Sequence, residues 1–157
     1  MKTRESTAKW QGSVACVVGL SPDNVWEILE FGRLSRWDPN AIESSDIVHG
    51  DGFSEGSIRC VVFKCGNGSR GMLYERLLNY DSHHFSYTYA LDENPLGYEG
   101  YMASIKLEDC GDGNTFVQWS FEMDPMDDGE LEDSVIGAIK RVFNRRLASL
   151  EGLMYHN

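Results

Sequence analysis

The sequence is poor in positive charge and has no long hydrophobic run. Its 157 residues include 14 lysines and arginines against 25 aspartates and glutamates, which gives a net charge of −11. An acidic surface repels phosphate groups, so we expect neither nucleic acid nor an anionic membrane as a partner. No run of about 18 apolar residues could span a bilayer. The polar start, MKTRESTAKWQG, also differs from a signal peptide.

Cysteine is scarce, and its spacing suggests no metal site. The four cysteines are Cys16, Cys60, Cys65 and Cys110, and no two of them form a C-x-x-C pair. We therefore expect no bound metal. A few cysteines that form no disulfide framework are typical of a reduced, cytoplasmic protein. We expect these thiols to be buried.

The composition otherwise indicates one globular domain. Hydrophobic residues make up 41% of the chain, and there is neither an internal repeat nor a low-complexity linker. We expect a single domain over residues 1–157, with residues 1–8 flexible. The strong negative charge favours a monomer or a small oligomer.

Alternating and helical patterns predict the order of the elements. A strand over 9–18 precedes a helix with Ser21 as N-cap and Pro22 at its first position, which Gly32 is expected to end. A second short helix or turn stops at Pro39. Six further strands follow, separated by turn-forming residues: 42–49, 56–65, 70–80, 84–91, 98–109 and 114–124.

The chain ends in a long amphipathic helix over 129–154. Its apolar side chains share one broad face: Leu131, Val135, Ile139, Val142, Phe143, Leu147, Leu150 and Met154. The predicted fold is therefore α+β, with a seven-stranded antiparallel sheet curled around this helix and two short helices after the first strand. Such a helix-grip arrangement leaves room for a ligand pocket between sheet and helix.

Two charged residues share the apolar faces of neighbouring strands. Arg59 alternates with Val61 and Phe63 in one strand, and Glu75 lies between Leu73 and Leu77 in the next. A turn centred on Asn67 would place Arg59 directly opposite Glu75. Two alternatives remain open: a weak salt bridge on the solvent face, since one β-bulge swaps the faces, or an acid and a base inside a pocket.

Aromatic hydroxyl groups follow on the later strands. Tyr87 and Tyr89 share a face, and Tyr101 shares another with Ala103. A buried tyrosine needs a partner for its hydroxyl, which a polar pocket would supply, although each tyrosine could instead sit at the rim. Trp119 alternates with polar residues and is expected in the wall, with ligand contact as a second possibility.

Several motifs together resemble the plant lachrymatory-factor synthases, a branch of the START-like, Bet v 1-like superfamily. The matching stretches include KWQGSV, SPDNVWEIL, GSIRCV, ERLLNYD, FSYTYAL, GYEGYMASI and VQWSFEM, in the family's order across most of residues 9–125. The resemblance implies a cofactor-free isomerase that converts a small alkenyl sulfenic acid into a thial S-oxide. It also implies an upstream lyase that supplies the substrate.

The same resemblance assigns the site residues. The family's essential arginine and glutamate fall on Arg59 and Glu75, expected to be catalytic, and its two pocket tyrosines fall on Tyr89 and Tyr101. Further substrate contacts are expected from four side chains on the same faces: Tyr87, Trp119, Phe63 and Leu73.

Two segments match the family only loosely. They are residues 37–53, expected to border the entrance, and the acidic turn at 91–97. Two other functions therefore stay open, since this fold hosts several. One is a non-catalytic carrier of small hydrophobic metabolites, and the other is a polyketide cyclase-like enzyme acting on a longer substrate.

Overall fold

The computed structural model describes residues 8–92, 94–126 and 132–154. Its elements in chain order are β1 (Trp10–Val18), α1 (Pro22–Ile28), the 3₁₀ helix η2 (Phe31–Arg33), α2 (Leu34–Trp37), β2 (Ile42–His49), β3 (Ile58–Lys64), β4 (Arg70–Asp81), β5 (Ser86–Leu91), β6 (Met102–Gly111), β7 (Asn114–Met123) and α3 (Glu132–Met154). The expected order is confirmed. Most of the segment predicted to be flexible, residues 1–8, lies outside the described residues.

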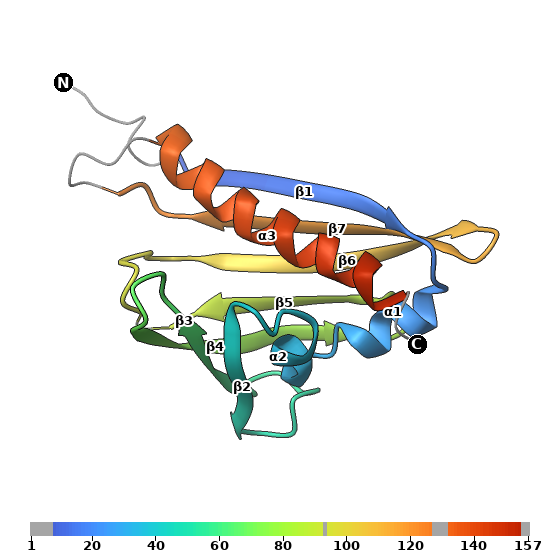
Figure 1. The fold of residues 1–157 in the computed structure, drawn as a ribbon, viewed down its shortest axis with the longest axis horizontal. Helices are drawn as coiled ribbons and strands as arrows, with labels where there is room; N and C mark the ends of the chain where they lie inside the picture. The colour runs from blue at the N-terminus through green and yellow to red at the C-terminus, as the bar shows by residue number, and fades with distance from the viewer. Residues whose placement is uncertain (1–7, 93, 127–131, 155–157) are drawn as a thin grey trace.

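Seven antiparallel strands form one sheet in the order β1-β7-β6-β5-β4-β3-β2. Figure 1 shows α3 crossing one face of this sheet above β1, β7 and β6. The short helix α2 packs beside β2, at the opposite edge of the sheet, and also contacts α3. The predicted helix-grip fold is confirmed. Three strands begin two or more residues later than predicted, at Ile58, Ser86 and Met102.

The first helix starts as predicted but ends early. The Ser21 hydroxyl accepts a hydrogen bond from the Asn24 amide at 3.4 Å and so caps the helix. The helix ends at Ile28 and not at Gly32, because Glu30 adopts an extended conformation before the chain enters η2. The carbonyl groups of Leu29 and Phe31 then lie in the connection between α1 and α2.

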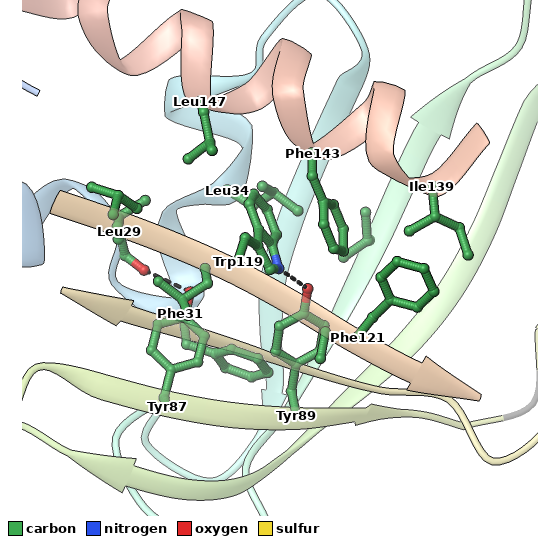
Figure 2. Close-up of a cluster of buried hydrophobic side chains, with 14 of the residues drawn as sticks. Leu29, Phe31, Leu34, Tyr87, Tyr89, Trp119, Phe121, Ile139, Phe143 and Leu147 are labelled. Atoms are coloured by element: carbon green, nitrogen blue, oxygen red, sulfur yellow. Dashed lines mark hydrogen bonds between the residues drawn. The ribbon is translucent and has the colours of Figure 1, made fainter. Parts of the chain in front are cut away.

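The apolar face of α3 supplies much of the core. Its buried side chains are Val135, Ile139, Phe143, Leu147 and Leu150, while Val142 is half-buried. Figure 2 shows three of them, Ile139, Phe143 and Leu147, pointing from the helix towards the sheet. Leu131 and the side chain of Met154, also predicted on this face, lie outside the described residues.

A β-bulge in β4 changes which side chains point inward. The register with β5 shifts between Leu77 and Asn79, so that Tyr80 lies opposite Tyr87 and joins the inner face. Tyr80 then packs against Trp26 with ring centres 5.1 Å apart. Simple alternation places Tyr80 outside, so this part of the core was not predicted.

The expectation of buried thiols is wrong. Cys16, Cys60 and Cys65 are half-buried, and Cys110 is exposed. Cys110 lies next to the tip of the β6–β7 hairpin, where no element covers the sheet. Across the described residues, no helix combines the length and the apolar content needed to cross a bilayer.

Candidate functional site

Arg59 and Glu75 form a buried ion pair beneath α3. The β3–β4 register places them opposite each other, as predicted. Arg59 Nε donates to Glu75 Oε1 at 2.7 Å, and Arg59 Nη2 lies 2.6 Å from the same oxygen. Their exposed fractions are only 1% and 7%. Of the two locations left open by the sequence, the inner face is therefore the correct one.

The third guanidinium nitrogen of Arg59 is also used by the protein. Nη1 donates to the Phe31 carbonyl oxygen at 2.6 Å. The guanidinium lies 4.2 Å from the ring centre of Phe31 and 5.1 Å from that of Tyr89. Burial by itself lowers the pKa of Arg59, but the charges of Glu75, Tyr87 and Tyr89 raise it above its ordinary value. Arg59 is thus a permanently charged anchor for the Glu75 carboxylate.

The two carboxylate oxygens of Glu75 differ in their contacts. Both contacts from Arg59 go to Oε1. Among the described residues, no hydrogen bond reaches Oε2, and Glu75 lines a cavity between the sheet and α3. A buried carboxylate oxygen normally has a hydrogen-bond partner. This oxygen is therefore available to a ligand.

The cavity has a volume of about 300 Å³. Much of its wall is apolar: Leu34, Ile42, Val61, Phe63, Leu73 and Phe143. The two loosely matching segments border it as expected, through Ile42 of the first and through Leu91 and Leu96 of the second. The volume lies at the lower end of the range for small-molecule sites, which favours a ligand of a few carbons or one or two rings.

The predicted site residues divide into two groups. Five of them line the cavity: Glu75, Tyr89, Tyr101, Phe63 and Leu73. Three others are buried behind this wall: Arg59, Tyr87 and Trp119. In this conformation the side chains of the second group lie behind the lining residues and support them.

Tyr87 and Trp119 are buried by contacts with other parts of the protein. The Tyr87 hydroxyl donates to the Leu29 carbonyl at 2.8 Å, and burial raises the pKa of Tyr87 to about 12. Trp119 stacks on Phe143 with ring centres 4.2 Å apart and donates from Nε1 to the Tyr89 hydroxyl at 3.2 Å. Figure 2 shows both hydrogen bonds and places Trp119 between the sheet and α3.

Tyr101 differs from the other buried tyrosines. Its ring stacks between Tyr98 and Phe121, with ring centres 5.9 and 6.0 Å away. Burial raises the pKa of Tyr101 well above its ordinary value, so the hydroxyl stays protonated. No hydrogen bond joins this hydroxyl to another part of the described chain. Tyr101 lines the cavity, and a phenol hydroxyl is chemically able to donate to an oxygen atom.

The two tyrosines give a matched prediction. Tyr87→Phe should lower the free energy of unfolding by about 1–2 kcal/mol, because the buried Leu29 carbonyl loses its donor. Tyr101→Phe should leave stability unchanged and weaken binding or turnover. Chemical denaturation and a ligand titration of both variants check this. The opposite pattern would place the functional hydroxyl on Tyr87.

Sequence reasoning missed two arginines at this site. Arg145 and Arg146 of α3 both line the cavity. Their positions depend on the rotation of α3 about its axis, which the hydrophobic pattern fixes only broadly. The adjacent pair of basic residues late in the helix was the only signal. Within the described residues, no group of three or more His, Cys, Asp or Glu side chains could hold a metal ion.

Comparison with known families identifies the family to which the chain belongs. The sequence profile of the family described as polyketide cyclase / dehydrase and lipid transport matches residues 9–154. The chain belongs to this family. A search of curated proteins finds no match. The comparisons therefore confirm the wider polyketide cyclase / dehydrase and lipid transport family. They do not test the resemblance to the lachrymatory-factor synthase branch.

Solved structures show the same fold. Ara h 8.0201 superposes with a TM-score of 0.77 at 20% identity, covering 96% of this chain and 100% of that one. XoxI from Bacillus cereus gives a TM-score of 0.76 at 22% identity, covering 91% and 94%. A protein from Nitrosospira multiformis gives 0.73 at 25% identity, covering 90% and 94%. At these identities the likeness supports the architecture shared by the polyketide cyclase / dehydrase and lipid transport family.

Proposed function

We propose that the protein is a cofactor-free isomerase that moves a proton within a small, weakly polar substrate bound under α3. The observation that carries this proposal is the Glu75 carboxylate, which Arg59 holds through Oε1 at the wall of the cavity. A positioned carboxylate in a mostly apolar cavity can take a proton from one substrate atom and return it to another. No redox step and no covalent intermediate are needed.

Each polar group then has a separate role. Arg59 does not contact the substrate but keeps the carboxylate oriented. Glu75 Oε2 transfers the proton. The hydroxyl groups of Tyr89 and Tyr101 border the same cavity and orient the substrate oxygen by hydrogen bonding. The apolar wall excludes water from the reacting atoms.

The proposed substrate is an alkenyl sulfenic acid, and the product is a thial S-oxide. In this isomerisation the S–O–H proton leaves oxygen and a proton is added to the distal alkene carbon, while the carbon–carbon double bond becomes a carbon–sulfur double bond. The lachrymatory-factor synthase motifs support this substrate, and so does the cavity of about 300 Å³. A polyketide of several fused rings would need more space.

The direct test supplies the substrate in situ. The purified protein is added to a lyase and an alkenyl cysteine sulfoxide, and the thial S-oxide is quantified by gas chromatography and mass spectrometry. We expect more thial S-oxide, and less of the thiosulfinate that sulfenic acids form spontaneously, than with the lyase alone. An unchanged product ratio would reject this activity.

A variant that fills the cavity links the reaction to this location. Ala138 lines the cavity from α3, whereas Ala148 lies exposed on the same helix and outside the cavity. Ala138→Phe should reduce turnover about tenfold or more by occupying the substrate's space. Ala148→Phe, the matched control, should leave turnover unchanged. Equal rates for the two variants would place the reaction elsewhere.

One observation favours binding without chemistry as a second candidate. All three nitrogen atoms of Arg59 are bonded to the protein, so the only certain role of the ion pair is to hold one carboxylate at the wall. A carrier would need no more than this. Incubation with metabolites followed by mass spectrometry of the recovered ligand separates the two functions, because a carrier returns its ligand unchanged.

A further inference from the structure

Arg146 is a second guanidinium at the cavity, half-buried and on the side opposite the sheet. Its side chain is 13% exposed, and Nε donates to Asp38 Oδ2 at 2.9 Å. Its guanidinium carbon lies 5.6 Å from the ring centre of Trp119. Asp38 and Trp119 thus fix the arginine in place beneath α3.

The terminal nitrogens of Arg146 are not used by the described part of the protein. Only Nε has a hydrogen bond there, although a guanidinium carries five N–H donors. Arg59 is the opposite case, because its Nε, Nη1 and Nη2 each have a protein partner. Arg146 is therefore a half-buried cation with donors to offer a ligand.

The surroundings of Arg146 are positive in an otherwise acidic protein. Lys64 and Arg145 also line the cavity, and Arg145 Nη2 donates to the same Asp38 oxygen at 3.1 Å. The cavity is lined by three cationic side chains, Lys64, Arg145 and Arg146, and by one anionic side chain, Glu75. The ion-pair partners behind the lining add one charge of each sign, Arg59 and Asp38. The whole chain, by contrast, carries a net charge of −11. This local excess of positive charge focuses attraction for an anion on the cavity.

Arg146 also lies near the Tyr89 hydroxyl, because its guanidinium carbon is 5.6 Å from the ring centre of Trp119 and Trp119 Nε1 donates to that hydroxyl at 3.2 Å. Burial raises the pKa of Tyr89 and of Tyr101, and the positive charge of Arg146 opposes that rise at both. A ligand oxygen beside the guanidinium could therefore also reach a phenol donor. Arginine together with neutral donors is a common receptor for anionic oxygen.

We infer that the ligand is a small apolar acid whose anionic oxygen is bound by Arg146, while its apolar part extends towards Glu75. Arg145 and Lys64 attract the anion at the entrance. The inference rests on the proposed function only in taking this cavity as the ligand site. For a sulfenic acid, the oxygen at Arg146 would be the one that gives up its proton.

Two probes of equal shape test this inference. Naphthalene-2-carboxylate carries the charge, and naphthalene-2-carboxamide is its neutral counterpart. Isothermal titration calorimetry at low salt should show the carboxylate binding the parent protein about tenfold or more tightly. Arg146→Gln should abolish this preference, Arg146→Lys should keep part of it, and Arg141→Gln should keep it fully, since Arg141 lies exposed on α3 outside the cavity.

The outcomes separate this inference from the proposed reaction. Equal affinities for the two probes in the parent protein would overturn it, and this comparison does not depend on any variant folding. A preference that survives in a folded Arg146→Gln protein, or no binding of either probe, would overturn it as well. None of these results bears on the thial S-oxide assay, which tests the reaction separately.

Discussion

Arg59→Met is expected to lower the free energy of unfolding by about 3–5 kcal/mol, because it leaves the Glu75 carboxylate buried without its counter-ion. The same change removes the donor to the buried Phe31 carbonyl. Methionine nearly matches arginine in length, so the loss reflects charge and hydrogen bonding more than volume. Urea denaturation of the parent and the variant measures the difference.

The double variant Arg59→Met/Glu75→Leu distinguishes this explanation from general damage to the core. Removing both charges should recover much of the stability, since an apolar pair can replace a buried ion pair at little cost. The exposed pair between Arg70 of β4 and Glu43 of β2 reaches across the strand between them, β3, and serves as the control. Arg70→Met should cost less than about 1 kcal/mol. Additive losses in the double variant would show that the two charges do not stabilise one another.

Glu75→Gln is expected to reduce turnover by about 10²- to 10⁴-fold, the usual contribution of a general acid–base group. Glutamine retains an oxygen that can accept from Arg59, so the geometry of the cavity should persist, but the amide cannot take up the transferred proton. The loss should appear mainly in kcat, because the group acts on the reacting atoms. Steady-state kinetics in the lyase-coupled assay provide the measurement.

The control for this variant is a glutamate elsewhere in the sheet. Glu43 is exposed on β2 and outside the cavity, so Glu43→Gln should retain the parent rate. Thermal unfolding of both variants shows whether a lost activity reflects chemistry or instability. A folded Glu75→Gln protein with the parent kcat would remove Glu75 from the mechanism and favour the carrier function.

The strand pattern explains why the Arg59–Glu75 pair could be predicted. A short turn fixes the register of the β3–β4 hairpin, and strict alternation then places both charges on one face. Alternation fails at the bulge after Leu77, which the sequence does not mark, and Tyr80 was therefore missed. Local sequence specifies register best where the ladder is regular.

The roles of individual side chains were harder to predict, because they depend on contacts between distant elements. Tyr87 and Arg59 donate to the carbonyl groups of Leu29 and Phe31, which lie in the connection between α1 and α2. No strand pattern indicates where these carbonyl groups dock. Arg146 was missed for a similar reason, since the rotation of α3 is set by its packing on the sheet.

The central claim is that a ligand binds under α3 in contact with the carboxylate of Glu75. A crystal structure of the protein with a stable analogue of the substrate, such as an alkenyl sulfinate, tests this claim most directly. We expect the analogue inside the cavity, with a heavy atom about 2.6–3.2 Å from Glu75 Oε2. An analogue bound outside the cavity, or inside it with Oε2 turned away, would contradict the account.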